Sequence, residues 1–170
     1  MAFLKIVLLT VAAAIVYGIA HDMVTTRVCV EYFTIGHPPV FNTTSPTLLA
    51  LGWGVIATWW FGLSLGLPLA LCAQSGGWPK LTARQLLKPL AVLLVIIAAV
   101  SLAAGLTGFL LARAGWVWLV EPLASAVPPD RHIPFLADLW AHNTAYLAGF
   151  VGAVVLCVWV WIRRKALITS

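Results

Sequence analysis

Charged residues are scarce in this sequence. Of its 170 residues, 9% are charged and only five are acidic, whereas 62% are hydrophobic. A typical soluble domain has about 25% charged residues, so the composition excludes that class. The net charge of +5 gives no reason to expect nucleic acid as a partner, because the basic clusters are too small for more than contact with anionic lipid.

Paired cysteines are missing as well. The chain has three cysteines, Cys29, Cys72 and Cys157, and none belongs to a CxxC pair. This argues against a thiol–disulfide enzyme and against a thiolate metal cluster. We expect the three thiols to act as small buried apolar groups.

Four apolar stretches dominate the rest of the chain, at residues 3–20, 48–73, 89–112 and 141–162. A bilayer core about 30 Å thick takes roughly 20 residues of helix, and backbone groups in lipid must be paired within the segment. We therefore predict an all-α integral membrane four-helix bundle, with residues 1–170 forming a single polytopic domain. Its expected surroundings are the lipid bilayer.

The middle of these stretches has few polar side chains, and we find there only Thr58, Ser64, Ser101 and Thr107. Ion-coupled transporters place ionisable residues within the membrane, so that class is disfavoured. A haem held between the centres of two spans is disfavoured for the same reason. A single haem at the outer edge, bound by His21 and His142, stays open.

Basic residues predict the orientation of the bundle. Three of them, Arg27, Arg113 and Arg131, lie on one side of the predicted spans. The other seven lie on the opposite side: Lys5, Lys80, Arg84, Lys88, Arg163, Arg164 and Lys165. The positive-inside rule then places both termini in the cytoplasm and two longer loops in the periplasm.

The first apolar stretch has a second interpretation. Lys5, the apolar run and Gly18-Ile19-Ala20 resemble a secretory signal with a small-residue cleavage site. Cleavage would leave His21 as the new N-terminus and three spans. The length of the run and the charge distribution favour a retained first span.

Small residues mark faces where helices can approach closely. Gly62 and Gly66 form a GxxxG pattern in the second span, and Ser101 and Gly105 form a similar pair in the third. Within one chain of four spans, such pairs serve internal packing more often than dimerisation.

The acidic residues and histidines gather in two polar segments on the predicted periplasmic side, which we call the polar rim. His21, Asp22 and Glu31 follow the first span, Asp138 precedes the fourth, and His142 lies at the start of the fourth. The conformation of residues 22–35 is open at this point. If they continue the first helix, Glu31 faces away from His21, and a site that uses both requires the segment to bend.

A helix that begins near Pro134 places Asp138, His142 and Tyr146 on one face, at intervals of four residues. An aspartate and a histidine at this spacing can bind a metal ion, or the carboxylate can orient the imidazole for proton transfer. Candidate metal ligands are His21, His142 and Asp138, and the candidate cofactor is a divalent metal ion. Candidate catalytic residues are His21, Asp22, Glu31, Asp138 and His142.

The competing interpretation makes these side chains anchors that hold the outer loops over the helix ends. The protein would then be a non-catalytic structural or accessory subunit that packs with a membrane-protein partner or with copies of itself. Convergence of His21 and His142 within metal-ligand reach would favour the site. Separate, solvent-facing positions would favour the accessory subunit.

One segment resembles a known group of proteins. His21-Asp22, Thr25 and Glu31-Tyr32-Phe33-Thr34 are similar to a motif in small uncharacterised bacterial inner-membrane proteins with four spans. The resemblance covers this segment and the four-span plan. It implies a protein of the bacterial inner membrane, and it transfers no activity and no catalytic residue.

Overall fold

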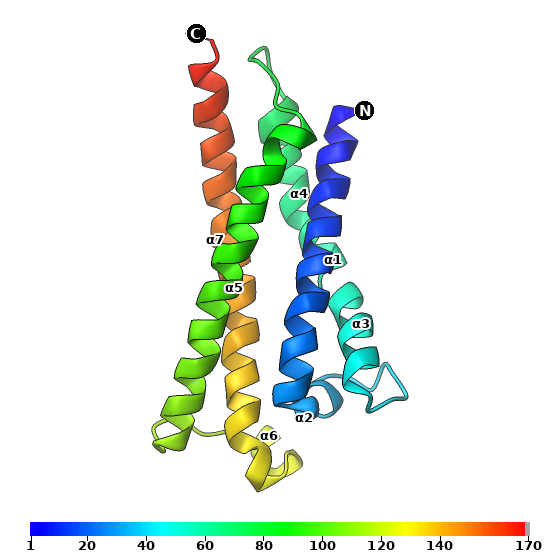
Figure 1. The fold of residues 1–170 in the computed structure, drawn as a ribbon, viewed down its shortest axis with the longest axis vertical. Helices are drawn as coiled ribbons and strands as arrows, with labels where there is room; N and C mark the ends of the chain where they lie inside the picture. Colours follow the sequence, from blue (N-terminus) through cyan, green and yellow to red (C-terminus); the bar gives the residue numbers. More distant parts are fainter. Residues whose placement is uncertain (169–170) are drawn as a thin grey trace.

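The structure, a computed structural model, describes residues 1–168, and every regular element in that range is helical (Figure 1). In chain order the elements are α1 (Ala2–Val28), α2 (Val30–Thr34), α3 (Pro46–Ile56), α4 (Trp59–Gln74), α5 (Ala83–Arg113), α6 (Leu123–Ala126), the 3₁₀ helix η1 (Pro129–Arg131) and α7 (His132–Ala166). Four segments are long and apolar enough to cross a membrane: α1, α3 with α4, α5, and η1 with α7. The all-α four-helix prediction is confirmed.

The helices extend beyond the apolar runs that predicted them. The first run ends at residue 20, but α1 continues to Val28, because no proline or glycine interrupts the polar residues that follow. The second span is broken at Ala57 and Thr58, where the Thr58 hydroxyl donates to the carbonyl of Gly54. This break separates α3 from α4 and turns the free carbonyl of Ala57 toward the bundle interior, where Tyr146 binds it.

The helices pack as two groups, with α1 along α3 and α4, and α5 along α7 (Figure 1). Gly62 and Gly66 of α4 face α1, and a Cβ atom at Gly66 would lie 1.9 Å from the Thr10 hydroxyl. In the other group, the Ser101 hydroxyl donates to the carbonyl of Ala141 at 2.8 Å. Small residues therefore serve packing within the chain, as predicted.

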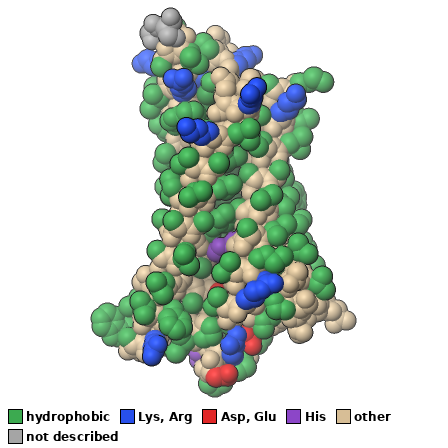
Figure 2. Space-filling model, viewed as in Figure 1, with side chains coloured by type: hydrophobic (Ala, Val, Ile, Leu, Met, Phe, Trp, Pro, Cys, Tyr) green, Lys and Arg blue, Asp and Glu red, His purple; other side chains and the backbone are tan. Residues whose placement is uncertain are grey.

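Both chain ends lie at the same end of the bundle (Figure 1). Basic side chains gather there, while the acidic side chains seen in Figure 2 lie at the opposite end. Many apolar side chains along the middle face outward, among them Leu102 at 71% exposure and Leu147 at 65%. Such a surface is suited to hydrocarbon and not to water, so the chain is a multi-pass membrane protein.

Arg164 closes the bundle at the end that holds the termini. Its side chain is buried, and its guanidinium donates to four backbone carbonyls at the end of α4 and in the turn after it. These acceptors are the carbonyls of Cys72, Ser75 at 2.7 Å, Trp78 at 3.1 Å and Pro79 at 2.8 Å. Arg164 therefore binds one carbonyl in the last turn of α4, that of Cys72, and three carbonyls of the turn that follows.

Candidate functional site

Four of the five predicted site residues lie on two facing helices. His21 and Asp22 are consecutive in α1, and Asp138 and His142 are one turn apart in α7. His21 lies seven residues before the end of α1, which corresponds to about 10 Å at 1.5 Å per residue. Asp22, Asp138 and His142 are 5%, 1% and 9% exposed. The site is therefore buried inside the bundle.

His142 has both ring nitrogens engaged. Nδ1 lies 2.8 Å from the backbone oxygen of Asp138, and Nε2 lies 3.2 Å from Oδ1 of Asp22. A carbonyl oxygen only accepts hydrogen bonds, so Nδ1 carries a proton and donates it. In a neutral imidazole, Nε2 then presents a lone pair to the Asp22 carboxylate. Two acceptors can face each other at this distance only when a proton or another cation lies between them.

His21 completes the group. Its ring meets the ring of His142 edge to face, with centroids 4.5 Å apart, and stacks on Tyr17 at 5.7 Å. Its Nε2 atom is buried and has no hydrogen-bond partner among residues 1–168. One ligand atom each from His21, Asp22 and His142 lies within 4.8 Å of the other two. The structure therefore brings together two imidazoles and one carboxylate.

Asp138 has a different place from the one predicted. Its backbone carbonyl, and not its carboxylate, orients the imidazole of His142. This follows from helix geometry, because a side chain at position i+4 folds back onto the turn that contains residue i. One carboxylate oxygen, Oδ2, is buried without a partner among the described residues. The carboxylate lies outside the group formed by His21, Asp22 and His142.

Glu31 also lies outside this group. Cys29 is extended, with φ −148° and ψ 97°, and this bend ends α1 and starts α2. The bend turns Glu31 toward α7, where its Oε2 accepts a hydrogen bond from Nε of Arg131 at 2.9 Å. Partial burial opposes ionisation of Glu31, but hydrogen bonds from its own backbone, Arg131 and Cys29 outweigh it and hold the pKa below its usual value. Glu31 is a structural ion-pair partner between α2 and η1.

The α2 segment forms one wall of the site. The Tyr32 ring stacks on His142 with centroids 4.5 Å apart, and the Tyr32 backbone oxygen accepts a hydrogen bond from His37 at 2.8 Å. Burial raises the pKa of the Tyr32 hydroxyl well above its usual value, and burial likewise raises that of the Cys29 thiol to about 11. Both groups are therefore neutral at ordinary pH, and Cys29 is not a thiolate ligand.

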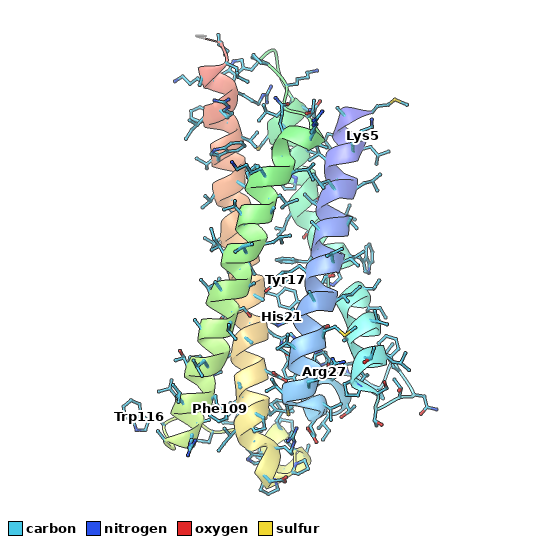
Figure 3. All side chains as sticks on the ribbon, in the orientation of Figure 1. Lys5, Tyr17, His21, Arg27, Phe109 and Trp116 are labelled. Atoms are coloured by element: carbon cyan, nitrogen blue, oxygen red, sulfur yellow. The ribbon has the colours of Figure 1, made fainter. Side chains whose placement is uncertain are left out.

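A cavity of about 130 Å³ borders the two histidines and Asp22. Figure 3 shows His21 and Tyr17 extending from α1 toward the space between α1 and α5. Sequence reasoning did not select Tyr17, His37 or Trp53, which also line this cavity. The sequence could have indicated Tyr17 as a neighbour of His21, because it lies four residues earlier on the same helical face. His37 and Trp53 come from separate segments, so no spacing could have linked them to the site.

Comparisons of the chain with protein-family models, with curated proteins and with solved structures found no match. The interpretation of the site therefore depends on its own geometry.

Proposed function

We propose that this chain is a metal-binding protein of the bacterial inner membrane and that His21, Asp22 and His142 hold a divalent transition-metal ion. The observation that carries the proposal is the convergence of two imidazole rings and one carboxylate, each of which offers a ligand atom within 4.8 Å of the other two. Nε2 of His142 faces Oδ1 of Asp22 at 3.2 Å, and the unpartnered Nε2 of His21 lies nearby. A cation at their centre would satisfy all three.

The spacing suits first-row metals. Bonds of about 2.0–2.2 Å to imidazole nitrogen and carboxylate oxygen place neighbouring ligand atoms roughly 3.0–3.6 Å apart. The His142–Asp22 distance of 3.2 Å lies in that range, and the His21 ligand atom lies within 4.8 Å of both. Nitrogen and oxygen ligands of this kind suit zinc, iron, manganese or nickel.

The surroundings of the ligands also resemble a metal site. The hydrogen bond from Nδ1 of His142 to the Asp138 carbonyl selects the tautomer whose Nε2 can coordinate. Three protein ligands leave a coordination position for water or substrate, which is typical of catalytic zinc sites and not of structural ones. That position would face the cavity.

The distribution of basic residues supports a site near the periplasmic face. Lys5, Lys80 and Arg163 belong to the end that holds both termini, which the positive-inside rule assigns to the cytoplasm. The resemblance of His21-Asp22 and Glu31-Tyr32-Phe33-Thr34 to bacterial four-span proteins supports the inner membrane as its location.

The first test is metal analysis of detergent-purified protein. We expect close to one equivalent of a transition metal in the wild type and at least a tenfold loss in Asp22→Asn. This variant is informative because the asparagine amide can donate to Nε2 of His142 and so preserve the packing, while it removes the charged ligand. The matched control is His132→Ala, since His132 contacts the Val127 carbonyl away from the group.

Two results would overturn the metal proposal. One is wild-type protein that stays free of metal after incubation with zinc, iron or manganese and removal of the excess. The other is equal metal content in the wild type and Asp22→Asn. Either result would favour a proton shared between His142 and Asp22, and therefore an acid–base role for the same residues.

A further inference from the structure

The cavity extends far beyond the metal-binding group. It begins at His21, Asp22 and His142 and continues along the bundle to Leu69, Leu90 and Leu156. Its remaining wall is mainly apolar and aromatic. A chamber that is polar at one end and apolar along its length fits a ligand with a polar edge and an apolar body.

The cavity opens sideways, toward the lipid. The two helix groups pack closely within themselves, while α1 and α5 have fewer contacts with each other (Figure 1). Figure 2 shows a furrow between them with histidine atoms visible at its floor, and His21 extends into this space in Figure 3. Leu94 of α5 lines the cavity and is partly exposed. A molecule dissolved in the bilayer can therefore reach the site without crossing water.

The lining restricts the charge of the head group. Among residues 1–168, the cavity wall contains no lysine or arginine, and Asp22 is its only acidic residue. Phosphate and sulfate head groups are usually bound by arginine or lysine. A head group without charge therefore matches this wall better than an anionic one.

The aromatic residues and one hydroxyl restrict the head group further. Tyr17, Trp53, Phe61 and Tyr146 line the cavity near the histidines, and flat rings stack well on such side chains. The Tyr17 hydroxyl is buried and faces Ser101 without hydrogen-bond geometry, so it can donate to a carbonyl oxygen of a ligand. Since a benzene ring occupies a cavity of about 150 Å³, the observed volume of about 130 Å³ matches one ring and not a whole lipid.

We propose that the cavity binds a lipid-soluble quinone, whose ring lies beside His21 and His142 while its apolar tail leaves through the furrow between α1 and α5. The inference deepens the proposed function, because the ring would meet the metal at its free coordination position. Binding of the ring itself is carried by the aromatic wall and Tyr17, so it can be tested separately from the metal.

The test is calorimetric titration of the detergent-solubilised full chain with a short-tailed ubiquinone analogue. Metal content is measured on the same samples. We expect saturable binding by the wild type and at least tenfold weaker binding by Leu94→Trp, because the indole fills the cavity beside the furrow. Tyr17→Phe should bind about three- to tenfold more weakly, as expected for one lost hydrogen bond. Leu102→Trp is the matched control, since Leu102 lies on the same helix at 71% exposure and does not line the cavity.

Three results would overturn the quinone proposal. The first is no saturable binding by protein that retains its metal, which would leave the proposed metal site intact. The second is equal affinity in Leu94→Trp and Leu102→Trp, which would indicate partition into detergent. The third is saturable binding of palmitate or a long-chain alcohol without binding of the quinone. Loss of metal with retained quinone binding would instead count against the proposed metal site alone.

Discussion

The two ends of the bundle bury polar side chains in opposite ways. At the end that holds the termini, Arg164 is 4% exposed and its guanidinium donates to four backbone carbonyls. At the other end, Nε2 of His21 and Oδ2 of Asp138 are buried without a hydrogen-bond partner in residues 1–168. Polar atoms are therefore buried at both ends, and these atoms differ in whether a hydrogen-bond partner is present.

This difference separates a structural role from a binding role. A buried polar atom without a partner costs about 1–3 kcal/mol, so unsatisfied atoms are kept where a ligand satisfies them or where chemistry needs them. The guanidinium of Arg164 makes its hydrogen bonds to carbonyls of the chain itself. In the group formed by His21, Asp22 and His142, Nε2 of His21 is buried without a partner among residues 1–168, and one ligand atom of each residue lies within 4.8 Å of the other two. We therefore predict that substitution of Arg164 mainly lowers stability, whereas substitutions in the group formed by His21, Asp22 and His142 mainly weaken ligand binding.

The largest effect on stability is expected for Arg164→Met. Methionine keeps most of the apolar stem but leaves the carbonyls of Cys72, Ser75 and Pro79 without a donor, so we expect a loss of about 3 kcal/mol or more in unfolding free energy. Thermal denaturation of the detergent-solubilised protein measures it. The control is Arg163→Met, because Arg163 is the exposed neighbour. Equal shifts in the two variants would show that Arg164 acts only as a surface charge.

Much of the fold is predictable from the sequence, because hydrophobic length alone determines which segments can span a bilayer. The helix ends are less predictable. Residues 21–28 and 132–140 are polar enough to end the apolar runs. Residues 21–28 contain no proline or glycine, and Pro134 lies in the first turn of α7, where proline is tolerated, so both helices extend beyond the apolar runs. For this reason Asp22, Asp138 and His142 are buried between helices, although they lie beyond or at the edge of the apolar runs.

The candidate site is predictable only in part. His21 and His142 were selected from residue type and side of the membrane, and the structure brings their rings together. Glu31 was selected in the same way, but one extended residue, Cys29, turns it to Arg131. Arg164 was counted as a topological charge, since nothing in its spacing reveals that backbone carbonyls surround it. Patterns of residue types along a sequence do not predict which side chains bind backbone carbonyls.

Glu31 and Arg131 form an ion pair at the same end of the bundle as His21, Asp22 and His142. The contribution of this pair to stability should depend on pH. Its pKa is lower in the folded protein than the usual value of about 4.3 in an unfolded chain. Its contribution is therefore fully present above that value and is lost as the pH falls through the folded pKa. We expect about 0.5 kcal/mol, because the Arg131 and Glu31 side chains are 33% and 22% exposed.

Thermal denaturation between about pH 6 and pH 3 checks this contribution against the Glu31→Gln variant. The wild type should lose its advantage over Glu31→Gln as the pH decreases. Glu121→Gln is the control, since Glu121 is exposed and bonds to Ser125 instead of a basic residue. A constant difference between wild type and Glu31→Gln across this range would show that the ion pair does not stabilise the fold.

The smallest effect on stability is expected at Tyr17, which lines the same cavity as Tyr146 and is best compared with it. The Tyr146 hydroxyl donates to the Ala57 carbonyl at 3.1 Å, whereas the Tyr17 hydroxyl is buried without a partner among the described residues. Removal of the hydroxyl in Tyr146→Phe should cost about 1 kcal/mol, because the Ala57 carbonyl loses its donor. The same change in Tyr17→Phe should alter the unfolding free energy by less than about 0.5 kcal/mol, or increase it, because no hydrogen bond is lost. Both are measured by thermal denaturation without added ligand. A loss of stability in Tyr17→Phe equal to that in Tyr146→Phe would show that the Tyr17 hydroxyl stabilises the fold. The hydroxyl would then no longer be a candidate ligand-binding group.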